Sequence, residues 1–321
     1  MNKKIVYIFL LSVLFTKSVK AQQDPMYSQY MFNMLAINPA YAGNHEVFGA
    51  TALFRQQWVG VPGAPQTFTL GFDVPDNKRG FGYGVQLVGD QIGIQKTNAV
   101  AGSFSYRTHV FSENDELALG FQGSMSNYSA NYNSVDLIQP YDPSFVGLVI
   151  NTWTPNVGAG IFYHTKDFYL GISSPTILSA QMQQVDATSI TRSAQSFFSI
   201  PHTYATTGFV FHLSDAIDLK PSAMLKLVKG APIEYDVNAQ IYLYDLISLG
   251  ASYRSNAAVV GMAGLQLTPN WRIGYAYDKD ITGFKAFNTG THEIMLGFAL
   301  NRSTKVANPR LMYSCTQMYR F

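Results

Sequence analysis

The sequence predicts an all-β protein, a transmembrane outer-membrane β-barrel of about 14 antiparallel strands. Three observations predict it. From about residue 47 to residue 300, apolar side chains alternate with small or polar ones; aromatic residues make up 14% of the chain and charged residues only 13%; and the connections between the alternating stretches are by turns short and long. Because successive side chains of a strand point to opposite faces, such a chain presents one face to lipid and the other to an enclosed lumen.

The alternation is clearest in two consecutive stretches. The predicted lipid-facing residues of the first are Phe68, Leu70, Phe72 and Val74, and those of the second are Phe81, Tyr83, Val85 and Leu87. Between them stand Thr67, Thr69, Gly71 and Asp73 in the first, and Gly80, Gly82, Gly84 and Gln86 in the second. The glycines precede no helix, so we interpret them as small lumen-facing residues and not as a nucleotide-binding loop.

Alternation and turn residues together predict fourteen strands. These are 47–55, 67–74, 80–89, 98–110, 116–126, 156–164, 167–174, 203–213, 217–228, 233–244, 246–254, 258–267, 271–278 and 291–300. Bacterial barrels have short periplasmic turns and longer outer loops. With a periplasmic N-terminus, the predicted outer loops are 56–66, 90–97, 127–155, 175–202, 229–232, 255–257 and 279–290. Every predicted connection longer than eight residues therefore lies on the outer side.

Charged residues inside the barrel region are predicted to face the lumen. Asp218, Lys220 and Lys226 alternate with apolar residues, and the next strand carries Glu234 and Asp236 in the same phase. Opposite charges on neighbouring strands can pair inside the lumen.

The first 21 residues are typical of an export signal. Lys3 and Lys4 precede an apolar run over 5–15, and Ala21 suits a cleavage site. The sequence therefore predicts a signal peptide over 1–21, an N-terminal periplasmic or plug segment over 22–46, the barrel over 47–300 and a periplasmic C-terminal tail over 301–321. A single cysteine, Cys315, excludes an internal disulfide and a thiolate zinc cluster, and the net charge of +2 indicates neither a nucleic-acid nor an anionic-lipid partner.

The segment before the first strand does not alternate. The spacing of Tyr27, Tyr30, Met31, Met34 and Leu35 predicts one apolar side of a short helix, which Asn38-Pro39 would end. This segment has two interpretations, which are compatible. In the first it is a plug that enters the lumen or packs at the barrel mouth; in the second it is a docking site that faces the periplasm.

The runs DPMYSQYMFNMLAINPAYAG, FRQQWVGVPGAPQTFTLGFD and THEIMLGFAL closely resemble the PorP/SprF family of outer-membrane proteins in the type IX secretion system of Bacteroidetes. The resemblance covers the mature chain and is strongest over 24–88 and 291–300. Two features depart from the family pattern: Met34 stands where proline is common, and the tail 301–321 extends past the point where many relatives stop.

The resemblance implies an accessory of protein secretion that helps export or retain a surface protein, such as a gliding adhesin, by associating with the client's C-terminal domain. The implied partners are that client, translocon or periplasmic components, and outer-membrane lipid. The residues predicted to contact partners are Tyr27, Tyr30, Met31, Phe32, Asn38, Pro39, Tyr41, Trp58 and Trp153. The two tryptophans are assigned because they fall in predicted outer loops.

The sequence offers little to catalysis. Its six histidines are scattered, no HExxH or Gly-x-Ser-x-Gly motif occurs, and neither a metal nor a cofactor is predicted. Two alternatives stay open: an outer-membrane channel for small or hydrophobic solutes, and an outer-membrane enzyme with a site at one rim.

Overall fold

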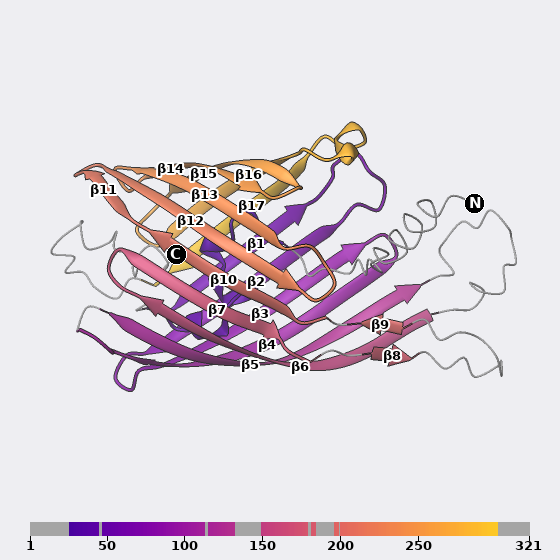
Figure 1. Ribbon diagram of the computed structural model, residues 1–321, viewed down its shortest axis with the longest axis horizontal. Coiled ribbons are helices and arrows are strands. Elements are labelled where there is room, and N and C mark those ends of the chain that lie inside the picture. Colours follow the sequence, from indigo (N-terminus) through magenta and orange to yellow (C-terminus); the bar gives the residue numbers. More distant parts are fainter. Residues whose placement is uncertain are drawn as a thin grey trace, which may run out of the picture.

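Fourteen antiparallel strands close into a single barrel (Figure 1). The computed structural model describes residues 26–44, 47–112, 115–131, 149–178, 181–183, 196–198 and 200–300. The first half of the wall is β1 (Gly49–Gln56), β2 (Gln66–Asp76), β3 (Phe81–Ile92), β4 (Gln95–Thr108), β5 (Glu116–Asn131), β6 (Val149–His164) and β7 (Phe168–Thr176). The second half is β10 (His202–Phe209) with β11 (Phe211–Ser214), β12 (Ile217–Val228), β13 (Glu234–Leu243), β14 (Ile247–Arg254), β15 (Ala258–Gln266), β16 (Trp271–Asp280) and β17 (Thr291–Ala299).

The pairing confirms the predicted strand count. Strands β10 and β11 are one barrel strand interrupted at Val210. Strand β10 lies between β7 and β12 and pairs with both, and β11 continues the pairing with β12. Strand β1 pairs with β17, with Gly49 opposite Ala299, and this last ladder closes the sheet. A separate two-stranded sheet joins β8 (Gln181–Gln183) to β9 (Ser196–Phe198).

The two faces of the wall are those that the alternation predicts. Along β2, Thr67 and Thr69 are buried whereas Phe68 is 45% exposed. The same alternation in β12 and β13 turns Lys226 and Glu234 inward, where their side chains form an ion pair at 3.6 Å. The outward face is apolar on both halves of the barrel, as a lipid-facing surface must be.

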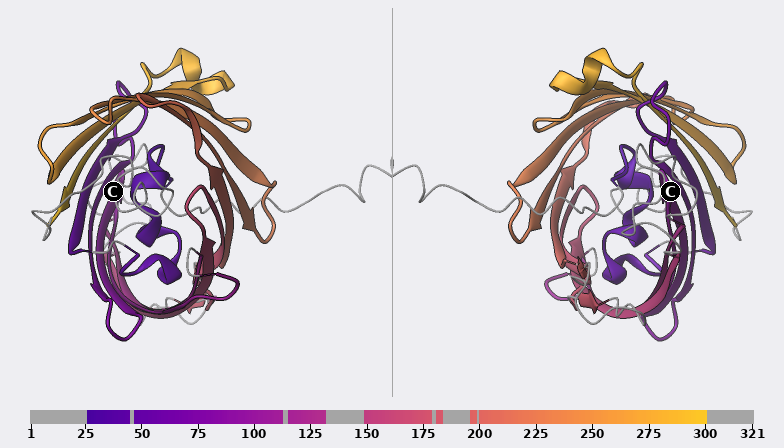
Figure 2. Two further views of the ribbon diagram at one scale, coloured as in Figure 1. Left: turned by 90° about the vertical axis from the view of Figure 1, so that its left-hand side faces the viewer. Right: turned by 90° about the vertical axis from the view of Figure 1, so that its right-hand side faces the viewer.

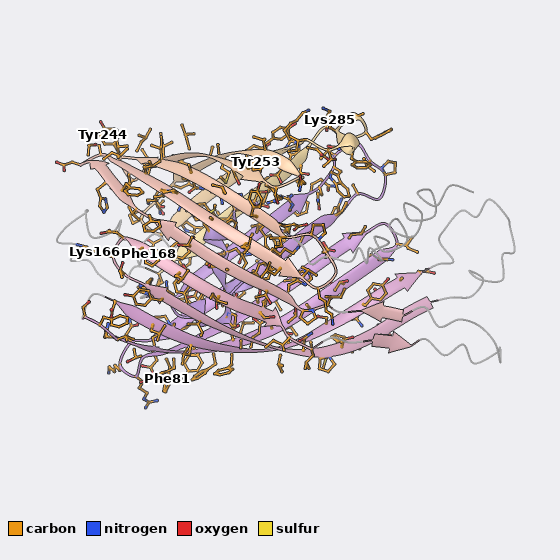
Figure 3. The ribbon with its side chains drawn as sticks, viewed as in Figure 1. Phe81, Lys166, Phe168, Tyr244, Tyr253 and Lys285 are labelled. Carbon is orange, nitrogen blue, oxygen red and sulfur yellow. The ribbon has the colours of Figure 1, made fainter. Side chains whose placement is uncertain are left out.

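Aromatic side chains gather on the outer surface toward both ends of the strands. At the end with short turns, Phe168 and Phe209 have ring centroids 4.8 Å apart, and Phe111 and Tyr244 are 82% and 79% exposed. Figure 3 shows Tyr244 and Phe168 near this end and Lys285 near the other. Toward the opposite end, the rings of Tyr235 and Tyr253 lie 6.2 Å apart. Two such girdles are expected where a barrel crosses the two membrane interfaces.

Every connection longer than eight residues lies at one barrel end, which we call the long-loop end, together with three shorter connections. The connections at the opposite end, the short-turn end, have seven residues or fewer. Two predicted loops are nevertheless wrong in extent. The predicted loop 90–97 is reduced to residues 93–94, and the predicted loop 127–155 begins and ends with strand residues. Trp153 consequently lies in β6, opposite Asn127 of β5, and not in a loop. Polar residues continue these ladders beyond the apolar band, so the alternation of hydrophobicity ends before the strand does.

The N-terminal segment lies inside the barrel, as Figure 2 shows in two views along the long axis. The predicted single helix is wrong. The segment instead forms three 3-10 turns, η1 (Tyr30–Phe32), η2 (Met34–Ala36) and η3 (Pro39–Tyr41), and a fourth, η5 (Gly283–Ala286), lies between β16 and β17. Within the described residues, no helix has the length and apolar character needed to cross a membrane. The predicted signal peptide and the predicted tail 301–321 lie outside the described residues.

Candidate functional site

Residues 26–44, which we call the plug, occupy the lumen of the barrel. All of them except Met26 and Ala36 are buried, and Tyr30 and Ala40 have no exposed surface. The plug begins among the strand ends of the long-loop end, where Ser28 meets Asp278, and it reaches Val74 and Pro75 at Gly43, close to a short turn. It therefore runs along the lumen from one end of the wall toward the other.

Inward-facing glycines of the wall leave room for the plug backbone. A β-carbon at Gly82 would overlap the carbonyl oxygen of Ala42, and one at Gly120 would overlap the backbone nitrogen of Ala40. Gly102, which faces outward, has no atom within 4 Å of such a β-carbon. Gly82, which the alternation predicts to face the lumen, and Gly120, for which no role was predicted, thus form a cradle for the plug backbone in the wall.

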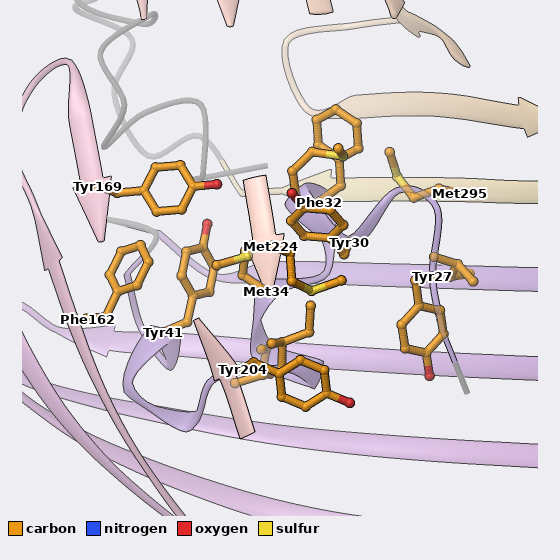
Figure 4. Packing of buried hydrophobic residues seen from close by; sticks show 14 of the residues in the cluster. Tyr27, Tyr30, Phe32, Met34, Tyr41, Phe162, Tyr169, Tyr204, Met224 and Met295 are labelled. Carbon is orange, nitrogen blue, oxygen red and sulfur yellow. The ribbon is translucent and has the colours of Figure 1, made fainter. Parts of the chain in front are cut away.

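Apolar and aromatic side chains of the plug pack against side chains of the wall (Figure 4). Tyr41 meets Phe162 of β6 edge-on with ring centroids 5.4 Å apart, and Phe162 in turn stacks on Tyr169 of β7 at 5.6 Å. On the other side of the plug, the guanidinium of Arg272 lies 4.0 Å above the ring of Phe32. This packing gives the barrel a hydrophobic core inside its lumen.

A network of buried charges holds the first turn of the plug at the long-loop end. The carboxylate of Glu293 accepts the backbone N–H groups of Ser28 and Gln29 at 2.8 and 2.7 Å. The Ser28 hydroxyl donates to Asp278 at 2.7 Å, and the Arg55 guanidinium donates to that hydroxyl at 2.8 Å. We call this network the latch; its wall residues are Arg55, Asp236, Arg254, Asp278 and Glu293.

The latch charges are paired with one another. Arg55 contacts Asp278 at 2.7 Å and Glu293 at 3.0 Å, while Arg254 contacts Asp236 at 3.1 Å and Asp278 at 3.2 Å. All five side chains are nearly completely buried. Removal of one partner from such a group leaves an uncompensated charge in a poorly hydrated site and costs about 3–5 kcal/mol.

Single hydrogen bonds from the wall secure the rest of the plug backbone. The Ser173 hydroxyl donates to the carbonyl of Ile37 at 2.9 Å, and the Ser105 hydroxyl donates to the carbonyl of Ala42 at 2.6 Å. The Asn38 amide donates to the Ile161 carbonyl at 3.0 Å, while its oxygen accepts the N–H of Ala40 at 2.9 Å and caps η3. The plug is therefore attached to several strands along its length.

The structure brings most of the predicted partner residues together in the plug. Seven of them are buried there: Tyr27, Tyr30, Met31, Phe32, Asn38, Pro39 and Tyr41. Trp58 is half-buried at the long-loop end, where its ring meets Phe284 with centroids 5.0 Å apart. Trp153 is 61% exposed on β6, apart from the plug residues.

Sequence reasoning missed most of the latch. Only Asp236 was assigned to the lumen, and no role was predicted for Arg55, Arg254, Asp278 or Glu293. The available signal was the phase of the alternation, since each of these charged residues stands in the inward phase near the long-loop end of its strand.

The described residues hold no group of three or more His, Cys, Asp or Glu side chains arranged to bind a metal ion. The site is instead an interior packed with protein, with an ordered outer end. There the backbone N–H of Val59 donates to the carbonyl of Gly290 at 2.8 Å, and the N–H of Thr289 donates to the carbonyl of Val59 at 2.9 Å, which ties together two long connections.

Solved structures similar to this chain are outer-membrane barrels. A Pseudomonas aeruginosa FadL homologue is 14% identical, with 87% of this chain and 95% of that chain covered and a TM-score of 0.48. The monoaromatic hydrocarbon channel CymD is 12% identical, with 88% and 95% covered and a TM-score of 0.48. Omp33 of Acinetobacter baumannii is 12% identical, with 79% and 98% covered and a TM-score of 0.44.

No curated protein sequence matches this chain. A sequence profile does: residues 19–298 match the family described as type IX secretion system membrane protein PorP/SprF. The match spans the plug and the barrel wall up to Phe298, one residue short of the end of β17, and it agrees with the resemblance carried by the opening and closing motifs. The chain belongs to the PorP/SprF family of type IX secretion system membrane proteins.

Proposed function

We propose that this protein is a partner-binding accessory of type IX secretion, which holds an exported surface protein, such as a gliding adhesin, through the client's C-terminal domain and helps to export it or retain it at the surface. Membership of the family supports the secretion role and the outer membrane as its location. The observation that favours binding over solute transport is the plug, which fills the lumen with hydrogen-bonded and tightly packed chain.

The client binds at the long-loop end in this proposal. Support comes from the ordered link between Val59 and residues 289–290, and from the side chain of Trp153, which lies outside the lumen and is 61% exposed. Periplasmic or translocon components would meet the short-turn end, where plug residues Ala42 and Gly43 approach the turn between β2 and β3. Each end of the barrel then has its own partner.

A pull-down from native membranes in mild detergent tests the proposal. The full chain and a variant without residues 132–148 and 184–195 are compared, and the proteins that accompany each are quantified by mass spectrometry. We expect the variant to lose an exported surface protein while keeping its periplasmic partners. A variant with a shortened 109–115 turn should keep the client, and equal client recovery from all three proteins would contradict the proposal.

Planar-bilayer recordings distinguish this function from a solute channel. Because the plug is attached along the lumen, we expect no steady open conductance from the full chain. A steady open pore at low voltage would instead support the channel. The proposed mechanism is association and needs no bond-breaking step.

A further inference from the structure

The lipid-facing surface of β16 and β17 carries a positive charge at its long-loop end. Tyr275, Tyr277 and Lys279 share the outward face of β16, and His292 of β17 pairs directly with Tyr277. The Tyr275 hydroxyl and Nδ1 of His292 are 2.6 Å apart. On the lipid-facing surface of β16, Lys279 therefore stands beyond Tyr275 and Tyr277, toward the long-loop end. Lysine side chains near the end of a lipid-facing surface extend from the acyl chains toward the membrane interface.

The connection above these residues continues the same surface. Phe284 in η5 and Phe287 just after it have ring centroids 5.9 Å apart, and the exposed Lys285 stands between them in the sequence. Phe287 is 70% exposed. Figures 1 and 2 show η5 beyond the wall at the long-loop end, outside the ring of strands.

Hydrogen bonds fix the shape of this connection. The Thr282 hydroxyl accepts the N–H of Phe284 at 3.1 Å, and the Asn288 amide donates to the Phe284 carbonyl at 2.8 Å. The Tyr277 hydroxyl donates to the Thr289 carbonyl at 2.6 Å, which joins the connection to the girdle below it. The aromatic side chains are thus held in place and their exposure is a property of the fold.

The two lysines lack acidic partners in the described part of the chain. No carboxylate there lies within ion-pair distance of Lys279 or Lys285. The acids nearest in sequence have other partners. Asp278 faces the lumen and pairs with Arg55 and Arg254, and Asp280 accepts hydrogen bonds from Thr282 at 2.7 Å and from Asn288 at 3.4 Å. Two ammonium groups beside exposed aromatic rings remain available to an anion from outside the protein.

We infer that this surface binds the phosphate-bearing headgroup of an anionic lipid in the outer leaflet. The rim patch, as we call it, consists of Tyr277, Lys279, Phe284, Lys285, Phe287 and His292. Because the rim patch continues the lipid-facing band, the ligand that reaches it is a lipid. Phe284 and Phe287 enter the boundary between headgroups and acyl chains, and the lysines contact the phosphate. Lipid binding at the rim patch does not depend on the proposed client binding, because the patch faces outward from the barrel wall toward the surrounding lipid.

Native mass spectrometry of the full chain in dodecylmaltoside micelles with diphosphoryl lipid A tests the inference. The variant K279Q/K285Q should bind lipid A roughly 30-fold more weakly than the unchanged protein, as expected for the loss of two cations at a lipid surface. The control K78Q/K166Q removes two exposed lysines at the short-turn end and should bind normally. Heat-modified electrophoretic mobility checks that every variant is a folded barrel.

Two further arms identify what the patch recognises. F284A/F287A should also weaken lipid A binding, and inorganic phosphate at equal concentration should fail to compete. The inference is overturned if the rim variant binds as well as the control, if inorganic phosphate displaces the lipid fully, or if K279Q/K285Q loses only a co-purifying protein while keeping lipid A.

Discussion

The carboxylate of Glu293 accepts the backbone N–H of Gln29 at 2.7 Å, so the last strand of the barrel holds the first turn of the plug. Strand β17 also closes the barrel by pairing with β1. Closure of the wall and retention of the plug therefore depend on the same strand.

Replacement of Glu293 by Gln should loosen the plug and leave the barrel closed. The amide cannot supply two equivalent acceptors, and Arg55 loses one of its two carboxylates. We expect a loss of about 3 kcal/mol in plug stability, which makes amide exchange over residues 28–44 roughly 100-fold faster. Glu116→Gln is the control, because Glu116 pairs with Arg107 and His164 instead of the plug. Unchanged exchange in the Glu293→Gln protein would show that the latch does not retain the plug.

A methyl group at Gly82 should displace the plug. The β-carbon would overlap the Ala42 carbonyl oxygen, and overpacking of this kind costs about 1–3 kcal/mol. The expected result for Gly82→Ala is cleavage of the plug by added protease while the barrel keeps its heat-modified mobility. Gly102→Ala, on the outward face, should stay resistant. Equal resistance of both variants would contradict a tight cradle.

The loss in unfolding free energy caused by a charged substitution on the lipid-facing band should depend on the depth of the residue in the bilayer. Phe121 is 64% exposed in the part of β5 that crosses the membrane, so Phe121→Arg should lower the free energy of unfolding in bilayers by about 2–4 kcal/mol. Phe111→Arg, in a short turn at the interface, should cost about 0–1 kcal/mol. Urea titrations of both variants measure the difference, and similar values would place Phe121 outside the bilayer.

The turn 109–115 should become less stable in acid. Burial acts to raise the pKa of Asp115, but hydrogen bonds from the backbone N–H groups of Val110, Ser112 and Phe111 outweigh it and lower the pKa below the ordinary value. A lowered pKa in the folded state stabilises the turn at pH values above about 4, and this contribution is lost as the pH falls through the folded-state value. Amide exchange of Val110 and Phe111, after correction for intrinsic rates, should therefore accelerate on acidification. Asp115→Asn should abolish this dependence, and its persistence in that variant would assign it to another group.

The barrel was predictable from the sequence because its main signal is local. The exposure of Phe68 beside the burial of Thr67 follows from the two-residue period of a strand, and the closed ladder between β1 and β17 follows from an even strand count. Strand ends were less predictable: the ladder of β5 and β6 continues past Trp153 through mostly polar residues, where the hydrophobic alternation has ended.

The plug and latch were predictable only in part. The apolar spacing from Tyr27 to Leu35 indicated a buried surface, but wall contacts and the residues Asn33 and Asn38 divide the segment into 3-10 turns. The latch depends on where each charged residue lies along the barrel axis. Arg55 and Asp278 are 223 positions apart in the sequence, and strand tilt and register bring them to the same level. Alternation predicts whether a residue faces the lumen or the lipid, but not its position along the barrel axis.

An engineered disulfide between the plug and the wall tests whether the plug lies in the lumen. A β-carbon at Gly84 would lie 3.3 Å from the β-carbon of Ala42, close to the separation of about 3.5–4.5 Å in a disulfide. In a Cys315→Ser background, the variant A42C/G84C should therefore oxidise in native membranes, and tryptic peptides from the denatured protein should remain joined until reduced. The pair A42C/G102C, with its second cysteine outside the barrel, should stay reduced. Free thiols in A42C/G84C, or equal crosslinking in both variants, would contradict a plug seated in the lumen.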